Sequence, residues 1–113
     1  MTAGSFRKLA LAMPESVEVG HMGHPDFRVG GKVFATLGYP DEAWAMVKLT
    51  PEQQEAFVAA DSVAFAPVKG GWGQRGATSV LLRRAKTARV RTALTAAWRN
   101  VAPAKLAGQV EVR

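Results

Sequence analysis

Apolar and polar residues alternate with two different periods along the chain, and the change of period predicts where helices and strands lie. Residues 3–13 carry apolar side chains at i, i+3, i+4 and i+7, the spacing of one helical face, and Pro14 ends the pattern. From residue 17 the period becomes two, which is typical of half-buried strands. The alternating runs are 17–22, 26–30, 32–38 and 44–50.

A glycine pair separates two of these runs and predicts a tight hairpin. Gly30 and Gly31 supply the positive φ angles that a two-residue primed turn requires. Two strands joined in this way are antiparallel neighbours. The first half therefore reads as one helix followed by an antiparallel meander.

The second half begins with a clear helix start. Thr50 fits the N-cap, Pro51 the first helical position and Gln53 the reciprocal place of a capping box. Two short apolar runs follow, 63–68 and 78–83, and predict a second hairpin-like element.

Residues 85–102 predict a last helix, because their apolar side chains form one stripe that Pro103 ends. Residues 107–113 are expected to form a flexible tail. The order is α-β-β-β-α-β-α, with a possible fourth strand before the second helix. It predicts an α+β fold in one domain, 1–113, with helices packed on one side of an antiparallel sheet.

Composition narrows the class of protein. Hydrophobic residues make up 48% and charged residues 21% of the 113 residues, a globular balance. The chain has no cysteine, which excludes disulfides and thiolate chemistry and suits a cytoplasmic protein. It has no apolar run of membrane-spanning length, and the apolar stretch near the N-terminus is too short for a signal peptide. We therefore expect a cytoplasmic protein that does not span the membrane.

Charge is distributed unevenly along the chain. Residues 1–62 hold five lysines and arginines against eight acids, whereas residues 63–113 hold ten against Glu111 alone. A half this basic favours a polyanionic partner, nucleic acid first. A merely solubilising surface remains the alternative.

The basic half contains the glycine-rich stretch KGGWGQRGATS, residues 69–79. Its G-x-G-x-x-G pattern lacks the following helix and the downstream acid of a dinucleotide site, and Ala77 stands where a phosphate P-loop needs lysine. We expect instead a mobile loop whose backbone approaches phosphates. Trp72 either folds onto the core or lies exposed. The expected phosphate donors of the loop are Lys69, Gln74, Arg75 and Thr78.

Four stretches together resemble the MmcQ/YjbR family of small bacterial proteins. They are GHPDFRVGGKVFATL (23–37), VKLTPEQQEAFV (47–58), APVKGGWGQRGATSVLL (66–82) and AWRNVAPAKL (97–106). The resemblance implies a CyaY-like fold and a DNA-binding protein with a double-wing arrangement of hairpins. The family pattern carries over to Arg28, Lys32, Lys48, Trp72, Arg75 and Thr78. With the loop donors and two further arginines of the basic half, the expected nucleic-acid-binding residues are Arg28, Lys32, Lys48, Lys69, Trp72, Gln74, Arg75, Thr78, Arg83 and Arg84.

Enzyme and metal functions find little support. No acid, histidine or hydroxyl spacing matches a catalytic motif. If one strand carried both histidines, His21 and His24 would lie on opposite faces and make a poor joint metal site. Frataxin-like iron binders, which share the implied fold, use an acidic first helix, whereas this one carries Arg7 and Lys8 and no acid. We expect no enzyme activity, metal or cofactor.

Two functions remain in competition. The first is DNA binding through the phosphate backbone, largely without sequence specificity. The second is binding of a small molecule, or a drug-resistance role, in an apolar pocket between sheet and helices. The candidate lining residues of that pocket are Phe34, Trp44, Phe65 and Trp98, although aromatics at such spacing usually belong to the core.

Overall fold

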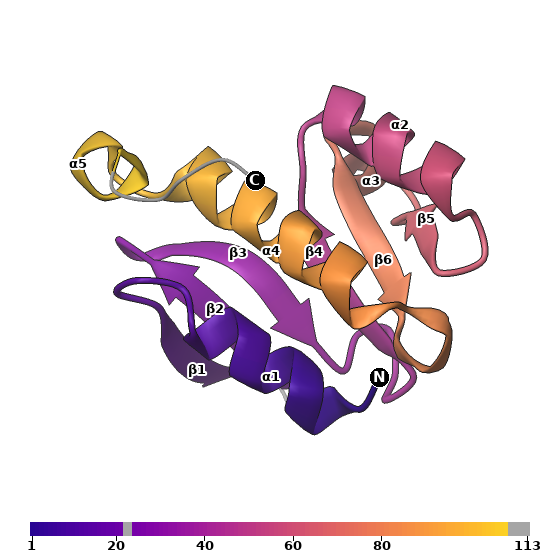
Figure 1. Ribbon diagram of the computed structural model, residues 1–113, viewed down its shortest axis with the longest axis horizontal. Helices are drawn as coiled ribbons and strands as arrows, with labels where there is room; N and C mark the ends of the chain where they lie inside the picture. The colour runs from indigo at the N-terminus through magenta and orange to yellow at the C-terminus, as the bar shows by residue number, and fades with distance from the viewer. Residues whose placement is uncertain (22–23, 109–113) are drawn as a thin grey trace.

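An antiparallel sheet of six strands organises the computed structural model, which describes residues 1–21 and 24–108 (Figure 1). The spatial order is β1-β2-β3-β4-β6-β5, and every pair of neighbours is antiparallel. The strands are β1 Val17–His21, β2 His24–Val29, β3 Lys32–Leu37, β4 Trp44–Lys48, β5 Phe65–Pro67 and β6 Ala77–Leu81. The predicted α+β class with an antiparallel sheet is confirmed.

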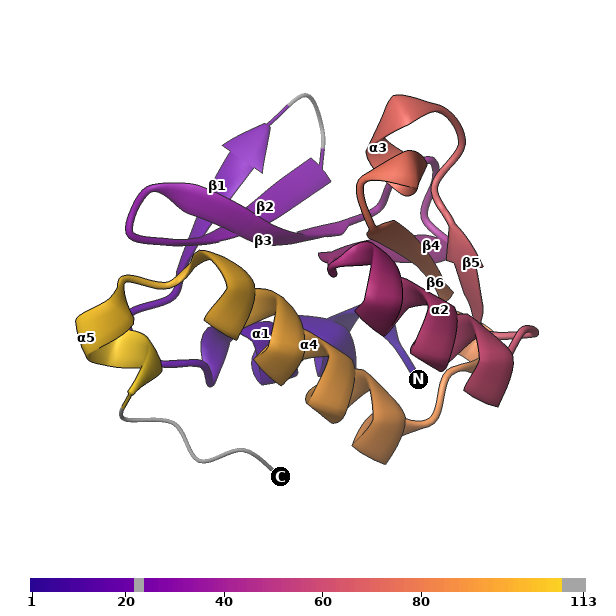
Figure 2. The same cartoon turned by 90° about the horizontal axis from the view of Figure 1, so that it is seen from above.

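The helices divide unequally between the two faces of the sheet. The three longer ones lie on one side: α1 Ala3–Leu11, α2 Pro51–Ala60 and α4 Thr87–Val101 (Figure 2). The short helix α3, Gly71–Gln74, lies on the other side, next to β6. The face that α3 shares with β2, β3 and β4 therefore has no long helix over it. None of the described helices is long and apolar enough to cross a membrane.

A β-bulge in β3 changes which of its side chains point to each face of the sheet. The register between β2 and β3 shifts by one residue after Phe27, which leaves Phe34 as the extra residue. Phe34 and Ala35 are consecutive, yet both are fully buried in the core beneath α1 and α4. Thr36 then lies on the opposite, open face, level with Asp26 of β2.

The local start and turn signals read from the sequence are confirmed. Gly30 and Gly31 have φ angles of 58° and 79°, as a primed hairpin turn requires. At the start of α2, the Thr50 hydroxyl accepts from the Gln53 amide at 3.2 Å. The Gln53 side chain accepts from the Thr50 amide at 2.9 Å, which completes the capping box.

Three boundaries differ from the prediction. The run 78–83 leaves the sheet early, because residues Leu82–Arg84 form a turn of 3₁₀ helix, η1. The last long helix is slightly shorter than 85–102 and is followed by a further turn, α5 Ala104–Ala107. Ala107 thus belongs to a helix, while residues 109–113 of the predicted tail lie outside the described residues.

Candidate nucleic-acid interface

The glycine-rich stretch forms the short helix α3, in place of the expected mobile loop. Gly73 packs so closely against the residue that follows β5 that a Cβ on Gly73 would lie 1.6 Å from the Val68 carbonyl oxygen. Gly76 has a φ of 111°, and a Cβ there would stand 2.0 Å from the Leu49 carbonyl oxygen. Gln54 of α2 adds two donated hydrogen bonds, to the carbonyls of Gly73 at 3.0 Å and Ala77 at 2.9 Å. The glycines therefore allow close backbone packing that anchors α3.

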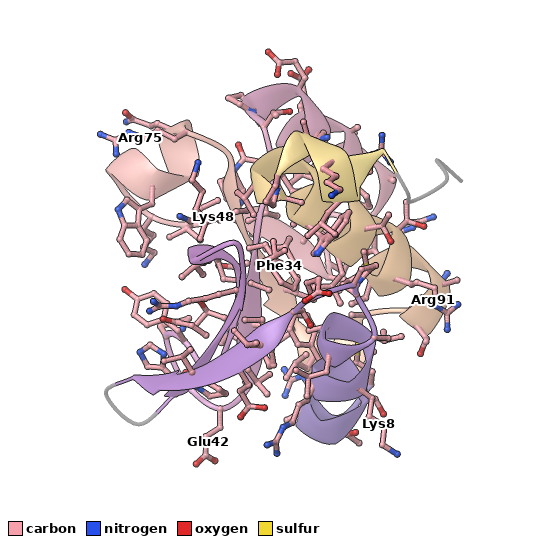
Figure 3. The ribbon with its side chains drawn as sticks, turned by 90° about the vertical axis from the view of Figure 1, so that its left-hand side faces the viewer. Lys8, Phe34, Glu42, Lys48, Arg75 and Arg91 are labelled. Carbon is pink, nitrogen blue, oxygen red and sulfur yellow. The ribbon has the colours of Figure 1, made fainter. Side chains whose placement is uncertain are left out.

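Anchored in this way, α3 presents an aromatic ring to solvent. Trp72 is 59% exposed, which decides between the two alternatives for this side chain. Lys69, Gln74 and Arg75 are exposed on the same segment. Figure 3 shows Arg75 and Lys48 together on one side of the molecule, with Arg91 and Lys8 on the other.

A cleft of about 350 Å³ lies on the open face of the sheet, with Trp72 among its walls. Tyr39 and His24 also line it, and their rings meet edge to face with centroids 5.8 Å apart. The remaining lining residues are Asp26, Val33, Thr36, Met46, Lys48 and Val68. The cleft thus combines three aromatic side chains with a few polar groups, the composition usual for a ligand site.

The floor of the cleft contains a buried carboxylate. Asp26 is only 8% exposed and accepts hydrogen bonds from the Thr36 hydroxyl at 3.1 Å and from Arg28 Nη2 at 3.3 Å. The alternation of β2 places Phe27 in the core and Asp26 and Arg28 on the open face. Arg28 Nε is buried and has no hydrogen-bond partner among the described groups. Arg28 therefore neutralises Asp26, and because Arg28 is not among the residues that line the cleft, its buried Nε is not presented to a bound ligand.

The cations around the cleft carry uncompensated charge. The ion pairs in which both partners are described residues are Arg7–Glu18 and Arg28–Asp26. Lys48, Lys69 and Arg75 are exposed and take part in neither. Lys32 is also exposed, but the register pairs it with Val29, whose side chain is fully buried in the core, so Lys32 lies on the face of the sheet that carries the long helices and not on the cleft face. The part of the cleft rim that Lys48, Lys69 and Arg75 form beside α3 is therefore positively charged.

Besides Lys32, three further predicted residues lie outside this surface. Thr78 is fully buried, and its hydroxyl donates to the Gly76 carbonyl at 2.8 Å, so it stabilises the turn after α3 and is not a surface donor. Arg83 and Arg84 are exposed, but they lie on η1, beyond the end of β6 that is remote from α3. The buried position of Thr78 follows from the register, because β6 turns that residue toward the core.

The pocket expected between sheet and helices is absent from the described core. Phe34, Phe65 and Trp98 are fully buried and fill that space. The cleft lies on the opposite face, and the sequence reasoning missed most of its lining. Strand alternation alone indicates that Asp26 faces away from the core. Asp26 lies near Thr36 and Tyr39 only because of the register between β2 and β3, which cannot be read from the sequence.

The histidines are also placed differently from the expectation. His21 and His24 belong to two strands, β1 and β2, and are directly paired in the register. The premise of one continuous strand was therefore wrong. Within the described ranges, no group of three histidines, cysteines or acids is placed to hold a metal ion.

The comparison with family models agrees with the resemblance seen in the sequence. The YjbR family model matches residues 11–100. The chain belongs to the YjbR family. No curated protein matches it. A crystal structure of the Deinococcus radiodurans protein DR2400, described with the domain DUF419, is similar with a TM-score of 0.73. The match covers 88% of this YjbR chain and 78% of that protein at 18% identity, so it supports the fold alone.

Proposed function

We propose that this YjbR protein binds nucleic acid through α3 and the open face of its sheet, and that it acts by binding and not as an enzyme. The observation that carries the proposal is the exposed Trp72 on an anchored helix, next to Arg75 and Lys69. An aromatic plane beside unpaired cations is the combination with which proteins hold bases and phosphates together.

Phosphate contacts supply the driving force in this proposal. Each phosphate neutralised by lysine or arginine releases condensed counterions and contributes about −0.9 to the slope of log affinity against log salt for duplex DNA, and about −0.7 for single strands. From its few exposed cations we expect this surface to engage about 3–5 phosphates. We expect dissociation constants of about 10⁻⁴–10⁻⁶ M at physiological salt, the range of non-specific binders.

The described helices offer no side-chain set for reading a sequence in the major groove. The only asparagine, Asn100, lies at the end of α4, and its amide donates to the Lys48 carbonyl at 3.0 Å and to Gln53 Oε1 at 2.8 Å. It is therefore occupied within the protein. Binding should discriminate weakly between duplex sequences.

A pair of matched arginine variants tests the proposal. Arg75→Ala removes a cation from the proposed surface, whereas Arg91→Ala removes one from the exposed side of α4, away from it. Anisotropy titrations with labelled DNA at several salt concentrations should show weaker binding and a slope reduced by about one for Arg75→Ala only. Equal slopes for both variants and the wild type, or no binding even at about 20–50 mM salt, would contradict the proposal.

A small free ligand is the second candidate, because the cleft has the size and lining of a ligand site. The expected signal comes from Trp72, the tryptophan in the cleft wall. An aromatic compound that binds there should quench its fluorescence at micromolar concentration, and the Trp72→Phe variant should lose that quenching. Under this alternative, DNA should have no effect at physiological salt.

A further inference from the structure

We infer that the cleft receives one unstacked base of single-stranded DNA, and that a base with an exocyclic amino group fits it best. The inference rests on the proposed function and adds to it the form of the partner, a single strand with accessible bases. Three features of the cleft carry it: its aromatic walls, the acceptor in its floor and the cation at its rim.

The walls suit a flat ring. Trp72 of α3 lines the cleft together with the Tyr39–His24 pair, and Trp72 and Tyr39 are 59% and 44% exposed. Because every base has an aromatic face, stacking on such side chains tolerates any sequence and is strong enough to hold a base out of a strand. A duplex would first have to give up stacking and pairing, so a single strand is the favoured source.

The floor suits a hydrogen-bond donor. Each Asp26 oxygen already accepts one bond, from Thr36 or Arg28, and a carboxylate oxygen has a second acceptor position. Cytosine N4 is a donor that aspartate accepts, whereas thymine presents a carbonyl oxygen at the same position. The cleft should therefore prefer cytosine to thymine.

The rim suits the phosphate attached to that base. Lys48 lines the cleft, is exposed and forms no ion pair among the described residues. Lys69 and Arg75 flank Trp72 in the chain and extend the same positive charge along α3. A base in the cleft thus leaves its backbone beside cations and away from the single carboxylate, which Arg28 neutralises.

Three strands of equal phosphate number, about 12 nucleotides long, test the inference. They are oligo-dC, oligo-dT and a fully abasic strand, titrated at one low salt concentration. We expect oligo-dC to bind about 5–10-fold more tightly than oligo-dT, and the abasic strand to bind most weakly. Tyr39→Ala should reduce oligo-dC binding toward that of the abasic strand and leave abasic binding unchanged. Asp26→Asn should reduce the preference for cytosine.

The outcomes separate this inference from the proposed function. Equal binding of all three strands would overturn the base-binding cleft and leave phosphate binding intact. Absence of binding to every strand would overturn both. Free dCMP that binds as tightly as oligo-dC would overturn the single strand as partner. The abasic strand is the control for folding, because a misfolded Tyr39→Ala or Asp26→Asn protein would lose that binding as well.

Discussion

Single glycine residues decide whether the glycine-rich stretch is a mobile loop or a packed helix. Four glycines in the sequence suggest a flexible backbone. In the structure, Gly73 and Gly76 instead allow close packing, since the absence of a Cβ lets the backbone of each lie against a neighbouring backbone segment. The same stretch then turns Trp72 outward. These two glycines thus hold α3 in place, and the exposed side chains of α3 are the proposed contacts to nucleic acid.

Two glycines of α3 give a matched test of that close contact. Gly73→Ala should destabilise the protein by about 1–3 kcal/mol, because the new methyl group overlaps the Val68 carbonyl. Gly71→Ala meets nothing within 4 Å and should be neutral or stabilising by up to about 1 kcal/mol. Urea unfolding midpoints measure both. Similar midpoints for the two variants would show that α3 is not packed as described.

Two tryptophans give a second contrast. Trp72→Ala should change the free energy of unfolding by less than about 1 kcal/mol, since the ring is largely exposed, yet weaken single-strand binding by about 1–3 kcal/mol. Trp98 is fully buried and its Nε1 donates to the Pro14 carbonyl at 3.0 Å. Trp98→Ala should cost about 3–5 kcal/mol of stability. Large destabilisation by Trp72→Ala would contradict an exposed binding role.

The position of α3 in the candidate surface depends on a few contacts with neighbouring elements. The short helix α3 has a single turn, so its position depends on its neighbours. Gln54 of α2 provides the side-chain hydrogen bonds that reach across to it. The capping box that starts α2 lies just before Gln54 and fixes where that side chain emerges.

Gln54→Ala tests this dependence. Loss of two hydrogen bonds should cost about 1–3 kcal/mol and loosen α3 more than the sheet. Amide hydrogen exchange should then accelerate at residues 73–77 and stay nearly unchanged in β3 and β4. DNA binding should weaken although no surface cation is removed. Uniform acceleration along the chain would argue against a local anchor.

The helices and strands could be predicted from the sequence better than the tertiary contacts between them. Local signals are sufficient for the Gly30–Gly31 turn, the capping box at Thr50 and the helical stripe of α4. The bulge at Phe34 breaks the alternation that predicted β3, so the two faces of that strand could not be assigned residue by residue. The cleft joins Asp26, Tyr39 and Trp72 from distant segments, and only the register brings them together.

The whole molecule has a net charge of +6, but its effect depends on where that charge lies. The basic second half read from the sequence does not form one surface. Arg83 and Arg84 lie on η1, beyond the sheet, whereas Lys48 of the acidic first half lines the cleft together with Trp72 of α3. Position in the fold and not position in the chain therefore selects the proposed contacts.

The central claim is that nucleic acid binds the open face of the sheet and α3. An NMR titration of the ¹⁵N-labelled protein with a short single strand at low salt tests it most directly. We expect backbone amide shifts to change along α3, at Lys48 and along β2–β3 near the cleft, and the indole resonance of Trp72 to move. Arg91 and its neighbours on the exposed side of α4 should stay unchanged. Changes confined to α4 and η1, or no changes at all, would contradict the account.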